Sequence, residues 1–209
     1  MIGRVIADVR RHGFSAVLVD DGSADATPEI AERAGAVVVR HPVNLGQGAA
    51  LQTGIEFGLR NGAEFVVTFD ADGQHRAAEI ETLIDALTES RSDFALGSRF
   101  LGATVNLPLS RRLLLKAATW FTRVTSGLRV TDAHNGFRAM TRRGASRIRL
   151  RQNRMAHASE FLEQIARSGL PYVEAPVTIE YSEYSLAKGQ KLSDALSILL
   201  DLSVQRLQR

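Results

Sequence analysis

The spacing of apolar residues along this chain alternates between the period of a helix and that of a strand. The first ten residues predict a helix whose apolar face comprises Ile2, Val5, Ile6 and Val9. Short apolar runs such as Ala16–Val19 and Val66–Phe69 are typical of strands, and helical patterns separate them. A basic irregular region follows the fourth strand, then a strand at Pro176–Ile179 and a helix at Leu192–Leu202. We therefore predict an α/β fold with a mostly parallel, Rossmann-like sheet and helices on both faces.

Two carboxylates stand at the end of the predicted strand Val66–Phe69. Asp70 and Asp72 are separated by Ala71, which is too small to block a ligand, and Gln74 follows. Carboxylate and amide oxygens suit a hard divalent cation, Mg²⁺ or Mn²⁺, that shares its coordination with phosphates. The alternative for so short a motif is an acidic loop that is simply solvated.

A second predicted strand, Ala16–Val19, also ends in acids. Asp20 and Asp21 follow it directly, and Ser23 lies in the turn beyond. Ligands of open α/β sheets bind outside the carboxyl ends of strands, so two acidic ends predict one shared crevice. An acid there can bind ribose hydroxyls or a base N–H. An ordinary turn rich in Asp, Gly and Ser is the alternative.

Two glycines, Gly46 and Gly48, open a predicted helix between these acidic segments. Backbone N–H groups at such a helix start can face an anion, and a glycine can also admit a close neighbour. The segment is not a dinucleotide fingerprint, because Leu51 replaces the third glycine, and no Gly-Lys-Ser/Thr follows. Phosphate contact and tight packing therefore both remain as roles for these glycines.

In this order and spacing the three segments resemble the inverting family 2 glycosyltransferases, which have the GT-A fold. The resemblance continues through Gly97–Arg99, Asn135–Arg138 and Pro176–Ile179 and covers nearly the whole chain. The most similar subgroup is the polyprenyl-phosphate glycosyltransferases, such as the dolichol-phosphate mannose synthases. It implies one domain over 1–209, whose half 1–98 binds a nucleotide sugar and whose half 99–209 binds the acceptor.

The resemblance also implies roles for individual residues. The metal ligands, for Mg²⁺ or Mn²⁺, would be Asp70, Asp72 and Gln74. The residues that bind the UDP- or GDP-linked donor would be Asp20, Asp21, Ser23, Gly46, Gly48, Asp70 and Lys188. Lys188 and Lys191 belong to a late loop that closes over the substrates in this subgroup; a solvated surface loop is the alternative.

One feature departs from the family. Its members begin with an apolar strand that ends in a Pro-x-Tyr-Asn-Glu-like segment and helps to hold the nucleotide. Here the first residues already predict the helix that follows such a strand, so we expect the sheet to lack its usual first strand. The alternative function is then a non-catalytic or N-terminally truncated remnant that binds nucleotide or lipid without turnover.

Composition narrows the class of protein. A chain of 209 residues with 44% hydrophobic content can bury a sizeable core. The absence of cysteine excludes disulfides and thiolate metal sites. Neither a signal peptide nor an apolar run of about 20 residues occurs, so a cytoplasmic protein is expected.

Half of the 26 Lys and Arg residues lie within 99–154, a segment with a single acid, Asp132. Within it, Ser110–Gly127 predicts a helix capped by Ser110, with an apolar stripe made by Leu113, Leu114, Ala117, Trp120, Phe121 and Val124. Basic residues at its edge suit peripheral contact with anionic lipid at the inner face of the cytoplasmic membrane. The alternative is a core helix with a solvated basic edge. Binding of nucleic acid is not expected, because no motif for it accompanies the charge.

The resemblance implies a polyprenyl-phosphate acceptor, with a saccharide as the alternative. Arg111 matches an acceptor-phosphate arginine and Arg99 one near the reaction centre, with Arg112 and Lys116 as further phosphate ligands. A phosphate monoester is largely a dianion at pH 7 and needs no strong base, and inversion follows from in-line attack. A saccharide hydroxyl would need a base, for which Asp132 and Glu160 are the candidates.

Two other enzyme classes share part of this pattern. A phosphatase with an aspartate nucleophile would also place Asp70 and Asp72 after an apolar strand. Gln74 stands where such an enzyme has threonine, and the acids at Asp20 and Asp21 would have no role. A sugar-nucleotide-forming nucleotidyltransferase would need a Gly-rich loop with a lysine near the start, which this chain lacks.

Overall fold

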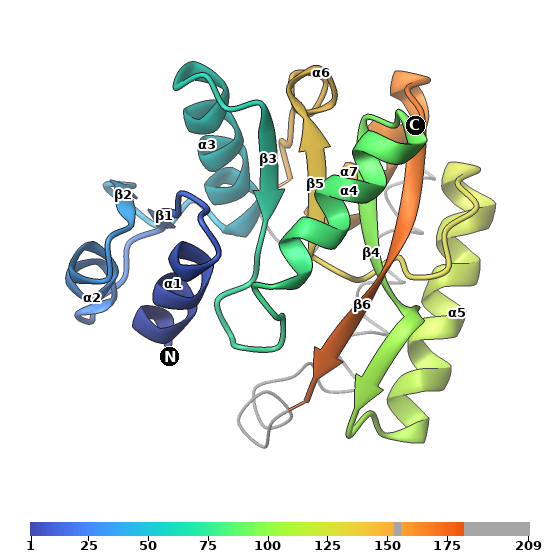
Figure 1. Ribbon diagram of the computed structural model, residues 1–209. Coiled ribbons are helices and arrows are strands. Elements are labelled where there is room, and N and C mark those ends of the chain that lie inside the picture. Colours follow the sequence, from blue (N-terminus) through green and yellow to red (C-terminus); the bar gives the residue numbers. More distant parts are fainter. Residues whose placement is uncertain (153–155, 182–209) are drawn as a thin grey trace.

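Helices and strands alternate along the chain, as the apolar pattern predicts (Figure 1). The computed structural model describes residues 1–152 and 156–181. Its strands are β1 (Val17–Asp20), β2 (Val37–Arg40), β3 (Phe65–Thr68), β4 (Phe94–Val105), β5 (Arg138–Thr141) and β6 (Tyr172–Glu180). Its helices are α1 (Ile2–Arg11), α2 (Thr27–Arg33), α3 (Gln47–Arg60), α4 (Glu79–Ser90), α5 (Leu109–Ser126), α6 (Arg142–Ala145) and α7 (Ala156–Ser168).

The described strands form two sheets. β1 and β2 pair in parallel, with Val17 opposite Val37. The other four follow the order β3-β5-β4-β6, in which β4 and β6 are parallel and β5 is antiparallel to both of its neighbours. Three of these four strands therefore run in one direction, and their arrows point downward in Figure 1. The predicted α/β fold is confirmed, but the apolar pattern missed β5, because it lies in the basic region expected to be irregular.

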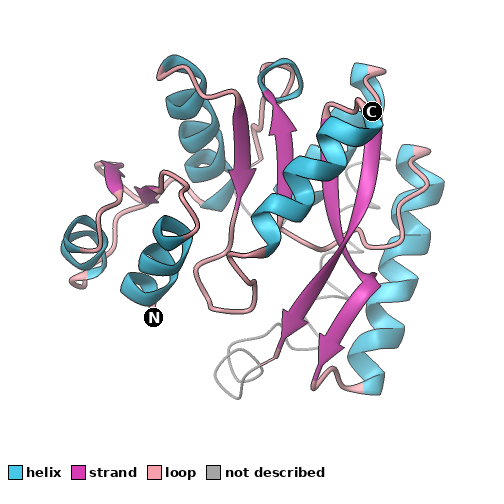
Figure 2. Ribbon diagram, in the orientation of Figure 1, coloured by secondary structure: helices cyan, strands magenta, loops and turns pink. Residues whose placement is uncertain are grey.

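Helices cover both faces of the four-stranded sheet (Figure 2). On one face α4 inserts Leu83 into a core that includes Ala95 of β4. On the other face Phe161 of α7 packs in a core with Phe94 and Leu96. Neighbouring residues of a strand point to opposite faces, so β4 supplies both cores by simple alternation.

β4 is irregular where Arg99 lies. Its pairing with β6 breaks after Ser98 and resumes at Ala103 with a shifted register. The hydroxyl of Ser98 accepts hydrogen bonds from the backbone N–H groups of Phe100 and Leu101 and so fixes the bulge. Bulges of this kind re-aim side chains next to functional sites. This one takes Arg99 out of the regular ladder.

The two-stranded sheet agrees with the expectation that the usual first strand is lacking. Among the described residues no strand pairs with the second edge of β1 or joins it to β3. β1 and β3 each contact α3 instead. Val17 and Val37, at corresponding positions of β1 and β2, are 39% and 49% exposed.

The long basic helix begins earlier than the sequence predicts. α5 starts at Leu109, directly after Pro108, and no side chain caps it. The cap predicted at Ser110 is therefore wrong, because Ser110 is already the second helical residue. The predicted end is confirmed: Gly127 adopts the left-handed conformation, with φ 75°, that commonly ends helices.

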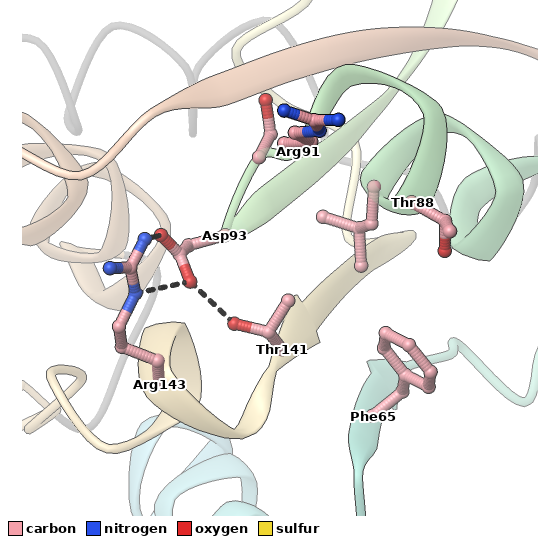
Figure 3. A pocket seen from close by; sticks show the side chains of 8 residues that line it. Phe65, Thr88, Arg91, Asp93, Thr141 and Arg143 are labelled. Carbon is pink, nitrogen blue, oxygen red and sulfur yellow. Dashed lines mark hydrogen bonds and ion pairs between the residues drawn. The ribbon is translucent and has the colours of Figure 1, made fainter.

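A hollow of about 380 Å³ lies near the starts of β3 and β4, at the end of the sheet opposite the acidic strand ends (Figure 3). Among its lining residues, Asp93 accepts hydrogen bonds from the guanidinium of Arg143 and from the hydroxyl of Thr141. The Arg143 hydrogen bond lowers the pKa of Asp93 against the opposing effect of burial. No predicted site residue lines this hollow.

Candidate functional site

The carboxyl end of β3 presents Asp70 next to two other segments. Its Oδ2 lies 3.4 Å from Nε2 of His75. The backbone of Gly136 packs so closely against it that a Cβ there would come within 2.5 Å of Oδ2. Burial would raise the pKa of Asp70, but His75 and Arg138 outweigh it and lower that pKa. Asp70 is therefore ionised at neutral pH.

Asp72 and Gln74 form the turn that follows. Oδ1 of Asp72 accepts a hydrogen bond of 3.0 Å from the backbone N–H of Gln74. Within the ranges 1–152 and 156–181 no three His, Asp or Glu side chains converge in a metal cage. Two carboxylates and one amide at a strand end nevertheless fit a hard divalent cation that takes its other ligands from a bound diphosphate. The donor set thus fits a cation that is shared with a substrate.

At the end of β1 the structure separates the roles of the two acids. Asp21 is engaged with the protein itself, since its carboxylate accepts hydrogen bonds from the backbone N–H groups of Leu45 (2.8 Å) and Gly46 (2.6 Å). Nδ1 of His41 lies 2.8 Å from its Oδ1. Burial opposes ionisation of Asp21, yet His41 and the two N–H groups lower its pKa. Asp21 therefore ties the tip of β1 to the loop that precedes α3.

The carboxylate of Asp20 has fewer hydrogen-bond partners among the described residues than that of Asp21. Its Oδ1 accepts a hydrogen bond of 3.1 Å from the backbone N–H of Ser23, and the residue is 6% exposed. Ser23 itself is exposed at the turn.

The two glycines at the start of α3 serve backbone geometry and packing. Gly46 precedes the helix with φ 95°, a conformation that side chains rarely adopt. Gly48 lies against the carbonyl oxygen of Gln152, which a Cβ would approach to 1.9 Å. The alternative that the sequence left open, close packing, is the one that the structure shows for Gly48.

Gly48→Ala should lower the free energy of unfolding by about 1–3 kcal/mol, because backbone atoms of Gln152 would have to move. Gly54→Ala is the matched control in the same helix, since its Cβ would meet only Cγ2 of Val19 at 3.5 Å. That change should raise stability by about 0.5–1 kcal/mol. Denaturant unfolding of both variants provides the measurement. Equal effects of the two changes would contradict a packing role for Gly48.

Arg99 is held rigidly by three partners. Its Nε lies 2.5 Å from Oδ2 of Asp132 in a buried ion pair, with side chains 7% and 0% exposed. Nη1 donates to the hydroxyl of Tyr181 (2.5 Å) and Nη2 to the carbonyl of His134 (2.9 Å). Burial would lower the pKa of Arg99, but Asp132 raises it, so the guanidinium stays charged.

Arg111 joins this cluster through the same tyrosine. Its guanidinium carbon lies 5.0 Å from the ring centroid of Tyr181, at cation–π distance. The structure thus brings together three predicted residues, Arg99, Asp132 and Arg111, from β4, the loop before β5, and α5. Arg112 and Lys116, predicted further along the same helix, are exposed.

The loop before β5 connects this cluster to the carboxylates at β3. It carries Asp132 at one end, and at the other the carbonyl of Gly136 accepts a hydrogen bond from the hydroxyl of Thr68. Arg138 is fully buried, and burial lowers its pKa to about 10, although Asp70 and Asp132 both oppose this shift. One buried guanidinium therefore interacts with the acidic residues of both parts of the site.

Glu160, the second candidate base, belongs to α7. This helix begins at Ala156, so Glu160 lies in its second turn. Its carboxylate accepts hydrogen bonds from the backbone N–H groups of Arg151 and Gln152. Lys188, the lysine Lys191 and the helix predicted at Leu192–Leu202 fall outside the described residues.

Sequence reasoning missed Tyr181 and Glu174. One carboxylate oxygen of Glu174 accepts hydrogen bonds from the N–H (2.6 Å) and the hydroxyl of Thr131 and so fixes the loop next to Asp132. The strand predicted at Pro176–Ile179 includes neither residue, because Glu174 precedes it and Tyr181 follows it. Their role depends on the bulge in β4 and on the path of the loop, for which the sequence carries no local signal.

Comparisons with known proteins point in one direction. The family model for glycosyl transferase family 2 matches residues 1–149. The uncharacterized protein MJ1222 of Methanocaldococcus jannaschii is 35% identical over 99% of this chain and 87% of its own length. The UDP-N-acetylglucosamine–dolichyl-phosphate N-acetylglucosaminyltransferase of Methanococcus voltae is 28% identical over 99% and 91%. The polyprenol monophosphomannose synthase of Mycolicibacterium smegmatis is 30% identical over 92% and 78%.

Solved structures show the same fold at lower identity. Glucosyl-3-phosphoglycerate synthase of Mycobacterium tuberculosis superposes with a TM-score of 0.69 and 18% identity, over 93% of this chain and 70% of that one. A second structure of that enzyme contains Mn²⁺ and UDP-glucose and has a TM-score of 0.67. At this identity the likeness concerns the fold.

Proposed function

Because the chain belongs to glycosyltransferase family 2, we propose that it transfers a sugar from a nucleoside-diphosphate sugar to a polyprenyl phosphate, with inversion. The observation that carries this proposal is the cluster of Arg99 and Arg111 around Tyr181. Two guanidinium groups held at one site suit a phosphate, to which each can donate paired hydrogen bonds. The named relatives that act on dolichyl or polyprenol phosphates support the same acceptor class.

The donor would bind across the acidic ends of β1 and β3. Asp20 and Ser23 would hold the nucleoside, while Asp21 holds the loop at Gly46 through hydrogen bonds to its backbone. Gly48 would contribute by admitting the backbone of Gln152. Lys188 would close over the diphosphate. A neighbour that binds UDP-glucose with Mn²⁺ supports a donor of this class.

Asp70, Asp72 and Gln74 would hold Mg²⁺ or Mn²⁺, which supplies Lewis-acid stabilisation of the departing diphosphate. The ionised state of Asp70 favours this role, since the carboxylate needs no deprotonation before it binds. His75 and Gly136 restrict the position of that carboxylate before any ligand arrives. Such preorganisation lowers the cost of reaching the transition state.

The acceptor chemistry requires little proton transfer. A phosphate monoester has its second pKa near 6, so it is largely dianionic at pH 7 and is a competent nucleophile. Asp132 is bound to Arg99, and Glu160 is bound to backbone N–H groups. We assign both acids to positioning: Asp132 orients the arginine of the reaction centre, and Glu160 holds the segment that packs on Gly48.

The test is incubation of the purified chain with Mn²⁺, a short-chain polyprenyl phosphate and, in turn, UDP-N-acetylglucosamine, UDP-glucose and GDP-mannose. We expect a lipid-linked sugar from one donor, detected by mass spectrometry. A saccharide glycosylated in place of the lipid would overturn the acceptor. Release of inorganic phosphate from the lipid would indicate a phosphatase, and nucleotide binding without any product would indicate a non-catalytic remnant.

The proposal includes peripheral contact of α5 with an anionic membrane. This helix buries Thr119 and Thr122 toward the protein and exposes a stripe of large apolar side chains to solvent: Leu109 77%, Leu113 70%, Trp120 66% and Val124 62%. The positions recur at helical spacing, so they share one face. None of the helices in the described ranges is long and apolar enough to cross a bilayer. The exposed stripe argues against the core-packing alternative for this face.

The double variant Leu113→Ser/Trp120→Ser should bind anionic vesicles about tenfold or more weakly than the wild type, because it removes the large apolar side chains that would enter the lipid. Val37→Ser is the matched control, since it removes an exposed apolar side chain from β2. Co-sedimentation with vesicles of phosphatidylglycerol and of phosphatidylcholine gives the measurement. Equal binding of wild type and double variant would contradict membrane contact through α5.

A further inference from the structure

We infer that Tyr181 is a positioning residue that couples the two phosphate-binding arginines, through its hydroxyl to Arg99 and through its ring to Arg111. This deepens the proposed function and rests on it. Tyr181 directly follows β6 and is 2% exposed. Its two ends contact different arginines that arise from different elements, β4 and α5.

The ring of Tyr181 is fixed by the protein core. It belongs to the apolar cluster under α4, together with Val177 and Ile179 of β6. Its backbone N–H donates a hydrogen bond of 3.1 Å to the carbonyl of Val105 at the end of β4. A buried phenol needs a partner for its hydroxyl, and Arg99 Nη1 provides it at 2.5 Å. The side chain of Tyr181 is therefore held in a fixed position between the apolar core and the two arginines.

This placement gives the two halves of the side chain separate effects. The hydroxyl accepts a hydrogen bond from Nη1 of Arg99, whose guanidinium also binds Asp132 and the carbonyl of His134. Without the hydroxyl, the guanidinium of Arg99 can change its orientation while its ion pair with Asp132 is kept. The ring face stabilises the position of Arg111, whose helix is otherwise exposed along its outer side. Loss of the ring should therefore affect the capture of phosphate by α5.

Two substitutions separate these effects. Tyr181→Phe keeps the ring beneath Arg111 and removes only the hydroxyl, so kcat should fall about tenfold while KM for the polyprenyl phosphate stays within about twofold. Tyr181→Leu removes the ring as well, and KM for that acceptor should rise about threefold to tenfold in addition. KM for the nucleotide sugar should stay unchanged in both variants.

Tyr172→Phe is the matched control. Tyr172 opens the same strand, and its hydroxyl accepts a hydrogen bond of 2.9 Å from the backbone N–H of Arg129, with no arginine side chain involved. We expect this variant to retain both kinetic constants, and thermal unfolding should show whether the loss of either hydroxyl acts through stability.

Calorimetric binding of a short-chain polyprenyl monophosphate without donor gives a second measurement, which is independent of turnover. Weaker binding by Tyr181→Leu than by Tyr181→Phe would support the separate role of the ring. Suppose that the wild type transfers sugar and that both Tyr181 variants have its kcat and KM, or that both change the same one of these constants equally. Either result would overturn the coupling by Tyr181 and leave the proposed function standing. A wild type that neither binds the lipid phosphate nor transfers sugar to it would overturn the proposed function and this inference together.

Discussion

Asp72→Ala should abolish metal-dependent binding of the nucleoside diphosphate and lower transfer by about 100-fold to 1,000-fold, the range typical for loss of one transition-state stabilising group. The change removes one of only two carboxylates at the end of β3. Among the described residues no third acid or histidine converges with Asp70 and Asp72 to replace it. The fold should survive, because the carboxylate of Asp72 makes one hydrogen bond, to the backbone N–H of Gln74.

The measurement is calorimetric titration of UDP and GDP, each with and without Mn²⁺, into the wild type and Asp72→Ala. The nucleotide that binds the wild type only with Mn²⁺ identifies the base of the donor. Asp85→Ala, an exposed acid on α4, controls for the loss of one negative charge. Metal-dependent binding that is equal in Asp72→Ala and the wild type would exclude Asp72 as a ligand. Failure of the wild type to bind either nucleotide would contradict the donor site.

The sequence predicted the elements whose residues carry their own signal. The helix at the start, the strands at 16–19 and 66–69 and the stop at Gly127 all follow from apolar spacing or from a glycine. β5 could not be predicted in this way, because its four residues begin with Arg138 and lie between basic segments. The charged side chain of Arg138 is accommodated in the central strand by tertiary partners, among them Asp70 and Asp132, which lie close enough to interact with it.

In the candidate site, too, the sequence predicted the positions of residues but not their tertiary partners. Motifs at strand ends located Asp20, Asp70 and Asp72 correctly at the carboxyl edges of β1 and β3, because topology fixes where such ends lie. The partners of each acid depended on tertiary contacts that spacing does not encode. Asp21 is a clear case, since its carboxylate binds N–H groups that lie 24 and 25 residues further along the chain. Asp21 was predicted to bind the donor, and its carboxylate is instead engaged by backbone N–H groups of the protein itself.

Asp132→Ala should lower the free energy of unfolding by about 3–5 kcal/mol and abolish transfer, because it leaves the guanidinium of Arg99 buried without its counterion. Asp132 carries three N–H contacts: Nε and the backbone N–H of Arg99, and the backbone N–H of His134. Asp132→Asn keeps the shape and one acceptor oxygen, so it should lose less stability. Denaturant unfolding at pH 7 and transfer assays on the folded fraction measure the two effects.

A double variant separates the stabilising role of the pair from its catalytic role. Arg99→Met/Asp132→Leu replaces both buried charges by apolar side chains of similar size, which in other proteins is neutral or stabilising. We expect it to recover most of the stability lost in Asp132→Ala and to remain inactive, because the guanidinium of Arg99 is lost from the reaction centre. Arg143→Ala breaks the ion pair with Asp93 at the far end of the sheet and should leave transfer intact (Figure 3). Recovery of transfer in the double variant would show that the Arg99 charge takes no part in the reaction, since the fold would then be all that the pair supplies.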